Sequence, residues 1–285
     1  MEILQPTTLA EALELRAAHP DAKALAGGTD LMVELNFDRA RPRAVLDLTR
    51  VPELTEWAPG DGRLRVGAGV TYTRIEDELG ARLPGLAIAS RTVGSLQIRN
   101  RGTVGGNLAT ASPAGDALPP LFTSDAIVEL ASVRGARRVP VAGLITGPKR
   151  TSLAPDELIC GFDLPVAGGP QQFAKVGTRN AMVIAVCSFS LALWPEQRRV
   201  ATCIGSAGPT PLRAADAEAF IAGVLAEHGC WETGAELPEA AVAKFGELVA
   251  RAASPIDDVR GTAAYRRHAL GVLARRTLRW AWDER

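Results

Sequence analysis

Residues 99–116 read RNRGTVGGNLATASPAGD and carry the strongest signal in the chain. The stretch is dense in Gly, Thr, Asn, Ser and Asp and has almost no core-forming side chains, which predicts a long surface loop. Such a loop can present several backbone N–H groups and short hydroxyls to one anionic or sugar-bearing ligand. Glycine permits the close backbone approach that a cradle of this kind requires.

A second Gly-Gly turn lies far upstream, at Ala26-Gly27-Gly28-Thr29-Asp30. A short apolar run over residues 22–26 predicts a buried strand that leads into the turn, and the turn opens a short helix over about 31–36. A strand over 44–48 completes a small βαβ unit. Free N–H groups and the positive dipole end at a helix N-terminus favour a phosphate, whereas the simpler interpretation gives Thr29 and Asp30 only helix-capping roles. Two such turns predict one extended ligand held at two points.

The remaining elements follow from periodicity and capping signals. Thr8 and Glu11 form a capping-box pattern in front of the first helix. Up to residue 165 we expect helices over 71–79, 83–93 and 118–124, and strands over 63–66, 127–133, 137–139 and 157–164. After a linker at 166–170 we expect strands over 173–176, 182–193 and 200–205, then helices over 214–225, 238–251 and 262–280. Strands followed by helices in the last third predict an α+β layer.

Composition excludes several classes of protein. Of the 285 residues, 32 are Lys or Arg and 32 are Asp or Glu, so nothing in the charge balance points to nucleic acid or an anionic membrane. No apolar run approaches the roughly 20 residues of a membrane span. The first residues lack the basic and apolar regions of a signal peptide, so the expected location is cytoplasmic.

The cysteines and histidines are scattered along the chain. Cys160, Cys187, Cys203 and Cys230 show no C-x-x-C spacing, so we expect buried, reduced thiols and no metal site in this chain. No nucleophile elbow, phosphate-binding Walker loop or acid–base pair is visible, and no catalytic residue is assigned. The basic last helix is typical of a solvated face, or alternatively of a subunit contact, where Arg and Trp are enriched.

Together, the turn at 26–30, the segment 99–107 and Ser112-Pro113-Ala114-Gly115-Asp116 resemble the FAD-binding medium subunit of molybdenum hydroxylases. That family includes the flavin subunits of xanthine dehydrogenase and aerobic carbon monoxide dehydrogenase. The resemblance covers essentially the whole chain. It implies an α+β protein with a vanillyl-alcohol-oxidase or PCMH-type FAD-binding fold. The implied parts are an N-terminal βαβ FAD-binding subdomain (1–52), a second FAD-binding subdomain (53–168) and a C-terminal α+β subdomain (169–285) with a three-stranded sheet and helices.

The resemblance also implies a set of FAD-binding residues. The segment that wraps the FAD pyrophosphate corresponds to Ala24, Leu25, Ala26, Gly27, Gly28, Thr29, Asp30 and Leu31. Further FAD contacts correspond to Thr103, Gly106, Asn107, Thr110 and Asp116, and Ile159 and Lys175 match positions beside the flavin ring. Val93 falls on another flavin-adjacent position. Because Asp30 would repel a pyrophosphate, its side chain is expected to cap a helix or reach a sugar hydroxyl.

In relatives of this kind, a large molybdenum subunit carrying the molybdopterin cofactor oxidises the substrate, and a small iron–sulfur subunit with two [2Fe–2S] clusters passes the electrons to FAD. The resemblance therefore implies an electron-transfer subunit, in a dimer of heterotrimers, that reduces NAD+, a quinone or another small-molecule acceptor. Two alternatives stay open. One is a self-contained PCMH-type flavin oxidase or dehydrogenase, and the other is a non-catalytic nucleotide-binding scaffold.

Overall fold

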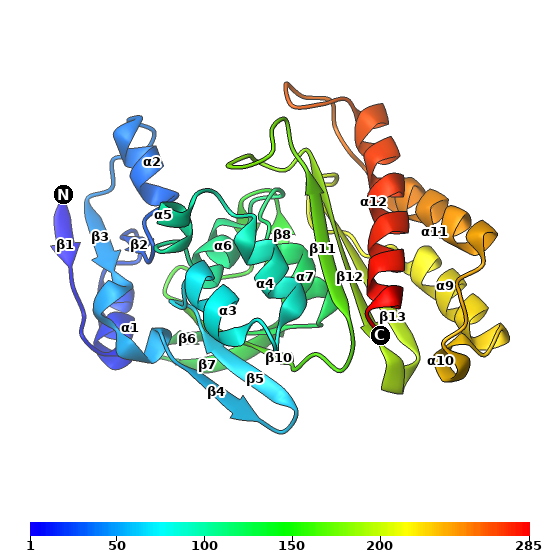
Figure 1. Cartoon of the computed structure of the whole chain (residues 1–285). Coiled ribbons are helices and arrows are strands. Elements are labelled where there is room, and N and C mark those ends of the chain that lie inside the picture. The colour runs from blue at the N-terminus through cyan, green and yellow to red at the C-terminus, as the bar shows by residue number, and fades with distance from the viewer.

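The three larger of four sheets lie side by side along the molecule, in the order in which the chain builds them, and the fourth is a two-stranded sheet within the middle part. The computed structural model describes all residues, 1–285. The N-terminal part lies at one end, the middle part with most of the glycine-rich segment lies next to it, and the C-terminal sheet with its covering helices lies at the other end (Figure 1). The predicted α+β architecture is thus present, while the predicted boundaries at residues 52 and 168 stay predictions.

The N-terminal part is a small parallel sheet in the order β1-β3-β2. Its elements are β1 (Glu2–Leu4), α1 (Leu9–Ala18), β2 (Lys23–Leu25), α2 (Leu31–Asn36), β3 (Ala44–Asp47), η1 (Leu48–Arg50) and η2 (Pro52–Leu54). β2 is an edge strand, and Lys23 and Ala24 are exposed. The prediction of a buried strand over 22–26 was therefore wrong in its burial, because only β3 pairs with this strand and little packs over it.

The first helix begins where the sequence predicts. The Oγ1 atom of Thr8 accepts a hydrogen bond from the Glu11 amide at 3.2 Å, which satisfies one free N–H of the first turn. The Glu11 carboxylate in turn accepts a hydrogen bond at 2.7 Å from the amide of Thr7, the residue before the N-cap. α1 buries Ala12 against the small core that includes Leu4, Leu46 and Leu54.

The middle part is a five-stranded antiparallel sheet in the order β4-β5-β10-β6-β7, with helices packed on it. The elements up to α7 are β4 (Trp57–Gly60), β5 (Arg63–Gly67), α3 (Tyr72–Leu79), α4 (Pro84–Arg91), α5 (Leu96–Arg99), α6 (Val104–Thr110) and α7 (Leu118–Thr123). The rest are β6 (Ile127–Ser132), β7 (Gly135–Pro140), α8 (Val141–Leu144), β8 (Ile145–Gly147), β9 (Arg150–Thr151) and β10 (Leu158–Pro165). The register of β10 on β6 shifts between Ile159 and Gly161.

The glycine-rich segment is not the long surface loop that its composition predicts. It forms the helix α6, whose N-cap is Thr103 and whose Val104 and Leu108 are fully buried in the middle core. α6 forms because the Thr103 hydroxyl caps it and because Gly105 lets the helix approach Ala68 closely. The prediction failed because it weighed the glycines and missed these two apolar residues, which lie four positions apart on one helix face.

The C-terminal part is an antiparallel sheet, β11-β12-β13, with helices over it. The elements are β11 (Gln171–Val176), β12 (Cys187–Trp194), η3 (Pro195–Gln197), β13 (Arg199–Gly205), α9 (Ala215–Glu227), α10 (Cys230–Thr233), α11 (Glu239–Ala252) and α12 (Ala263–Asp283). The predicted strand from Met182 begins only at Cys187, because Met182 has a φ of 49° and lies in a loop. Phe189, Phe245 and Leu270 are fully buried in the core between sheet and helices.

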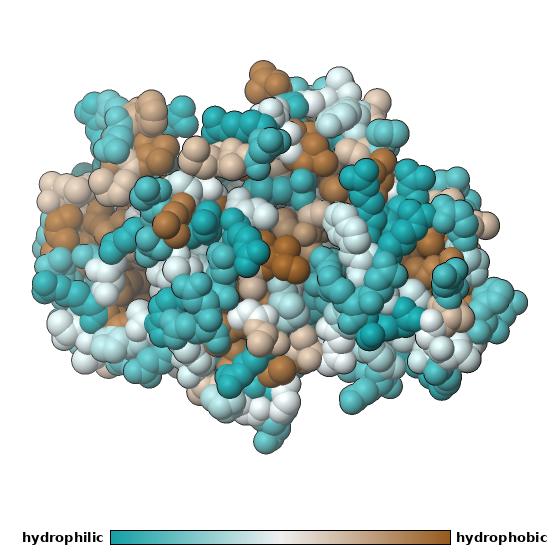
Figure 2. Space-filling model, viewed as in Figure 1, coloured by the Kyte–Doolittle hydropathy of each residue, from teal (hydrophilic) through white to brown (hydrophobic).

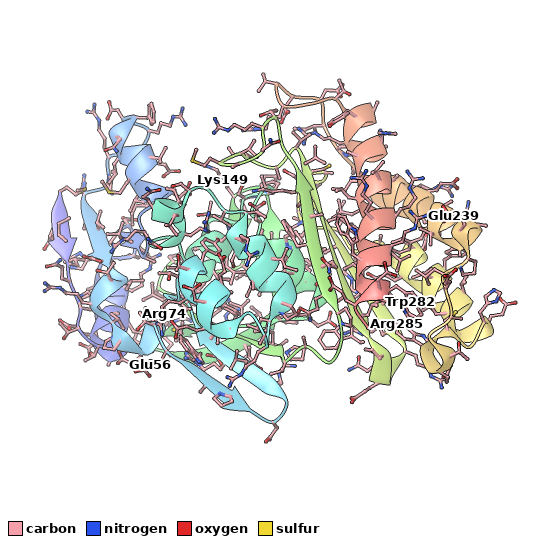
Figure 3. The ribbon with its side chains drawn as sticks, in the orientation of Figure 1. Glu56, Arg74, Lys149, Glu239, Trp282 and Arg285 are labelled. Carbon is pink, nitrogen blue, oxygen red and sulfur yellow. The ribbon has the colours of Figure 1, made fainter.

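The basic last helix is only partly a solvated face. The Arg266 side chain is buried, donates to the Ser206 carbonyl at 2.7 Å and pairs with Asp258 at 2.6 Å. At the other end of α12, the Arg285 guanidinium lies 3.9 Å from the ring centroid of Trp282 (Figure 3). Arg276 and Trp280 are exposed. Arg266 therefore binds α12 to neighbouring segments of the fold, whereas other arginines of the helix, such as Arg276, face the solvent.

The four cysteines are free and buried, as expected of reduced thiols. Burial raises the pKa of the Cys160 thiol to about 11.

No group of three or more His, Cys, Asp or Glu side chains gathers in metal-binding geometry. None of the helices is both long enough and apolar enough for a membrane span. Met32 and Val33 on α2 and Phe37 directly after it are exposed, and brown atoms mark this region of the surface (Figure 2).

Candidate cofactor-binding site

The two Gly-Gly segments, far apart in sequence, meet in the structure. A Cβ atom added to Gly27 would lie 2.0 Å from the carbonyl oxygen of Arg101, so the first turn packs directly on the backbone of the second segment. Gly28 has a φ of 75°, in the left-handed region that favours glycine. The two segments therefore lie together in the fold, and the single extended ligand that the sequence predicts between them stays a prediction.

Adjacent glycines in α6 have different surroundings. A Cβ on Gly105 would lie 2.4 Å from the Ala68 carbonyl oxygen, so this glycine is required by packing. A Cβ on Gly106 would have only the Thr103 Oγ1 atom within 4 Å, at 3.1 Å. The Gly106 amide donates to that same oxygen at 2.9 Å. Gly106 therefore leaves open space beside the helix, which is available to a ligand.

A side-chain hydrogen bond joins the two segments. Thr110 Oγ1 donates to Asp30 Oδ2 at 3.0 Å, across 80 residues of sequence. Asp30 is the N-cap of α2, yet its side chain makes no capping hydrogen bond. The alternative in which Asp30 caps the helix was therefore wrong, because the carboxylate turns toward Thr110 instead.

A cavity of about 390 Å³ opens at the first turn. The predicted site residues that line it are Leu25, Ala26, Gly27, Gly28 and Thr29. The structure adds Met32, Gln97, Ile98 and Arg101, which sequence reasoning did not assign to the site. Of these, Arg101 could have been found from the sequence, since it is a cation inside the glycine-rich segment itself. The other predicted residues do not line this cavity; among them, Ala24 lies on β2 and Leu31 opens α2.

Asp116 and Lys175 form a buried ion pair at the junction of the middle and C-terminal parts. Lys175 Nζ lies 2.5 Å from Asp116 Oδ2, and each side chain is 9% exposed. The ammonium also donates to the carbonyls of Thr92 at 2.8 Å and Val183 at 3.2 Å. Burial raises the pKa of the Asp116 carboxyl to about 6, although Lys175 acts in the opposite direction. Burial, helped by the Asp116 charge, also raises the pKa of the Tyr72 phenol.

The two residues expected beside the flavin ring differ in their placement. Lys175 joins Asp116 as described, whereas Ile159 is 7% exposed and packs in the middle core. Ile159 precedes the irregularity in β10, at which its neighbour Cys160 faces the N-terminal core instead. Val93 is partly buried against the middle core.

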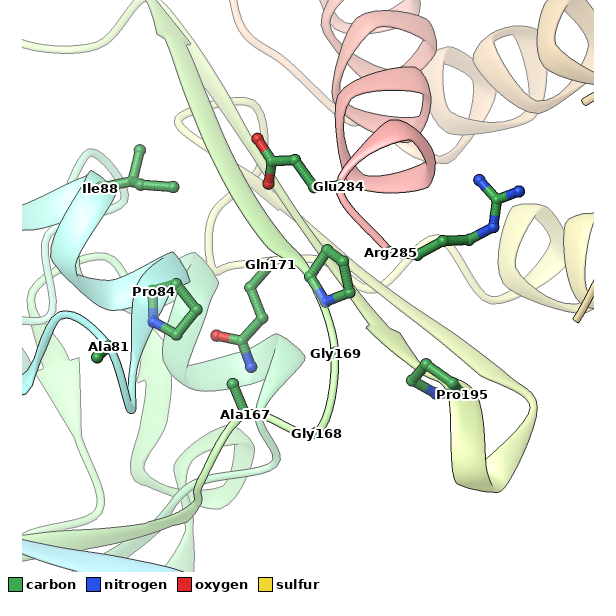
Figure 4. A pocket seen from close by; sticks show the side chains of 11 residues that line it. Ala81, Pro84, Ile88, Ala167, Gly168, Gly169, Gln171, Pro195, Glu284 and Arg285 are labelled. Carbon is green, nitrogen blue, oxygen red and sulfur yellow. The ribbon is translucent and has the colours of Figure 1, made fainter. Parts of the chain in front are cut away.

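A second cavity, of about 520 Å³, contains none of the predicted site residues (Figure 4). It lies where α4 approaches the linker before β11 and the end of the chain. Pro84, Gln171 and Glu284 are among the residues that line it. Here Gln171 Oε1 accepts from the Gly85 amide at 3.2 Å and Gln172 Nε2 donates to Glu284 at 2.7 Å. These contacts join two parts of the fold.

Two glycine-rich segments in contact, with a cavity beside the first, are typical of a site for a nucleotide cofactor. Comparisons with known proteins identify the cofactor. A family described as "FAD binding domain in molybdopterin dehydrogenase" matches residues 1–167, and one described as "CO dehydrogenase flavoprotein C-terminal domain" matches residues 172–281. The chain belongs to the family of FAD-binding subunits of molybdopterin dehydrogenases.

Relatives of known name agree with this assignment. The chain is 37% identical over 227 residues to a xanthine dehydrogenase FAD-binding subunit of Escherichia coli O157:H7, which covers 74% of this chain and 75% of that one. It is 32% identical over 278 residues to the nicotine 6-hydroxylase medium subunit of Paenarthrobacter nicotinovorans, covering 96% and 94%. The resemblance inferred from the sequence is confirmed, and the chain is an oxidoreductase flavoprotein by family.

Solved structures confirm the fold. A chain of the carbon monoxide dehydrogenase from Hydrogenophaga pseudoflava superposes with a TM-score of 0.89 at 27% identity, over 100% of this chain and 98% of that one. A chain of quinoline 2-oxidoreductase from Pseudomonas putida 86 gives a TM-score of 0.90 at 25% identity, over 99% and 97%.

Two features of the site fit FAD. The Oδ1 atoms of Asn107 and Asp116 are buried and have no hydrogen-bond partner, and a buried acceptor without a partner is costly unless a ligand donates to it. The hydroxyls of a ribityl or ribose group are donors of the required kind. Gly106 leaves the neighbouring space open, as the close approach of a cofactor requires.

Proposed function

We propose that this chain holds one FAD without a covalent bond and relays electrons within a molybdenum-containing dehydrogenase. The observation that carries the proposal is the contact between the two glycine-rich segments, with buried, unpaired acceptors on Asn107 and Asp116 beside them. When bound, FAD supplies the redox chemistry, taking up electrons from one partner and releasing them to another. The chain's own residues bind the cofactor, orient it and exclude water.

The proposed binding residues divide by chemistry. Gly27, Gly28 and Thr29 line the cavity, and we propose that their backbone amides meet the cofactor's phosphate oxygens. Asn107, Thr110 and Asp116 offer polar side chains to ribityl or ribose hydroxyls. The other proposed contact residues are Ala24, Leu25, Ala26, Asp30, Leu31, Thr103, Gly106, Ile159 and Lys175.

The proposed partners follow from the family and from the names of the relatives. We infer a small iron–sulfur subunit and a large molybdenum subunit, joined with this chain in a dimer of heterotrimers. The relatives named as a medium subunit and as a FAD-binding subunit of larger enzymes support this inference. NAD+ or a quinone is the proposed acceptor, and the cytoplasm the proposed location.

A self-contained flavin oxidase is the second candidate. Such enzymes often attach FAD through His or Cys, and neither residue type occurs in the turn 26–30 or in residues 99–116. The relay role is therefore favoured over it. A scaffold that binds a different nucleotide is disfavoured by the family assignment.

One set of measurements on the purified chain tests the proposal. Acid precipitation of the yellow protein is expected to release all of the flavin, and the released flavin is expected to be FAD. The chain alone is expected to reduce an artificial dye with NADH slowly and to oxidise no purine, aldehyde or heterocycle. Flavin that stays in the pellet would overturn the non-covalent assignment, and substrate turnover by the chain alone would overturn the relay role.

A further inference from the structure

We propose that the Arg101 guanidinium supplies the positive charge that pairs with the cofactor's diphosphate at the Gly27–Gly28 turn. This inference rests on the proposed FAD site and extends it to a residue outside the predicted set. Arg101 lines the 390 Å³ cavity together with the backbone of Gly27, Gly28 and Thr29. It is the only charged residue that lines this cavity.

The backbone of Arg101 is held in place beside the turn. Its carbonyl oxygen lies 2.0 Å from the position of a Cβ on Gly27, so the two backbones are in direct contact. Its amide donates to the Ile98 carbonyl at 3.2 Å, and the next amide, of Gly102, donates to the same oxygen at 2.6 Å. The Arg101 side chain therefore starts from a fixed point just after α5, next to the backbone of the Gly27 turn that lines the cavity.

The guanidinium of Arg101 has no partner within the protein. The neighbouring Arg99 lies 3.8 Å from the Glu76 carboxylate and also donates to the Val93 carbonyl. Arg101, by contrast, is exposed and takes part in none of the ion pairs of the chain. An arginine presents a planar fork of N–H donors that matches phosphate oxygens, so a free one beside open backbone amides suits a diphosphate.

The negative charges at the turn favour a cation at the position of Arg101. Asp30 follows the turn directly and carries a negative charge, and its hydrogen bond to Thr110 orients the carboxylate without neutralising it. A diphosphate placed beside Asp30 would meet only like charge and neutral amides if Arg101 were absent. With Arg101 on the cavity lining, the diphosphate has a positive neighbour there, which offsets the repulsion from Asp30.

The test measures cofactor affinity in the full chain after its flavin has been removed. FAD is titrated into wild-type protein and into Arg101→Gln, Arg101→Lys and the matched control Arg267→Gln, which removes an exposed arginine on α12. We expect Arg101→Gln to weaken FAD binding about tenfold, in line with the loss of one charge-assisted hydrogen bond. Arg101→Lys is expected to recover part of the loss because it keeps the charge, and the control is expected to match wild type.

Salt dependence separates a charge pair from a structural effect. Raising sodium chloride from 50 to 500 mM is expected to weaken FAD binding to wild type more than to Arg101→Gln, since the variant has no charge to screen. Wild-type affinity in Arg101→Gln, or an equal salt dependence in both proteins, would overturn the role of Arg101. A wild-type chain that binds no FAD would instead overturn the proposed function, so the two failures are distinguishable.

Discussion

Lys175 Nζ lies 2.5 Å from Asp116 Oδ2, and this buried pair joins β11 of the C-terminal sheet to the segment that follows α6. The ammonium has three N–H donors, and the carbonyls of Thr92 and Val183 accept the other two. All three donors are thus used within the protein, so the proposed contact of Lys175 with the flavin includes no hydrogen bond from its ammonium. The Asp116 carboxylate that Lys175 holds keeps a buried Oδ1 atom without a partner.

Replacing Lys175 alone is expected to destabilise the fold strongly. Lys175→Met leaves the Asp116 carboxylate buried without its partner, and breaking a buried ion pair in this way costs about 3 kcal/mol or more. Urea denaturation of the apoprotein measures the change in the free energy of unfolding. The double variant Lys175→Met, Asp116→Asn is the control, and it is expected to be more stable than Lys175→Met because no unpaired charge remains. Equal free energies of unfolding for Lys175→Met and wild type would contradict a stabilising role of the Asp116–Lys175 ion pair.

The pH dependence of stability is expected to carry a contribution from Asp116. Burial raises the pKa of its carboxyl to about 6 in the folded chain, against about 3.9 when unfolded. Between these values the folded state binds more protons than the unfolded state, so the Asp116 contribution is fully present below about pH 3.9. It is lost as the pH rises toward about 6. Urea denaturation of wild-type and Asp116→Asn apoproteins across this range measures it. The Asp116→Asn variant is expected to lack this decline in the free energy of unfolding. Equal pH dependence of unfolding in the two proteins would contradict a raised pKa of Asp116.

The sequence predicted the architecture better than it predicted the local structure of the site. The capping signal at Thr8, the helix start at Thr71 and the alternating pattern over 63–66 depend on short-range chemistry and were found. The helix α6 was missed, since its formation depends on Gly105 meeting Ala68, a contact that sequence spacing does not reveal. The same limit applies to Asp30, whose partner Thr110 lies 80 residues away. It applies also to the contact between Arg101 and the Gly27 turn, although Arg101 itself is visible in the sequence as a cation inside the glycine-rich segment.

The adjacent glycines of α6 are expected to respond to alanine in opposite ways. Gly105→Ala places a Cβ 2.4 Å from the Ala68 carbonyl oxygen, and overpacking of this kind lowers the free energy of unfolding by about 1–3 kcal/mol. Gly106→Ala meets only the Thr103 hydroxyl at 3.1 Å, so its stability is expected to stay within about 1 kcal/mol of wild type. Its FAD content is expected to fall, because the added methyl fills the space left for the cofactor.

Thermal unfolding of the apoproteins and the ratio of flavin to protein absorbance measure the two effects. A Gly106→Ala protein with full flavin content would contradict the placement of the cofactor beside this residue. A fully stable Gly105→Ala would show instead that α6 can move away from Ala68.

Two variants at the hydrogen bond between Thr110 and Asp30 test the charge of the Asp30 carboxylate separately from its orientation. Asp30→Asn keeps an oxygen that accepts from the Thr110 hydroxyl and removes the negative charge next to the proposed diphosphate. We expect it to bind FAD as tightly as wild type or a few-fold more tightly, since one exposed charge interaction is worth about 0.2–1 kcal/mol. Thr110→Val keeps the size of the side chain and removes the donor, so Asp30 is no longer held away from the turn. FAD binding is expected to weaken, whereas unfolding should change by less than about 1 kcal/mol because Asp30 is exposed. Titration of FAD into the apoproteins measures both affinities, and weaker binding by Asp30→Asn than by Thr110→Val would show that the carboxylate contacts the cofactor directly, at a sugar hydroxyl.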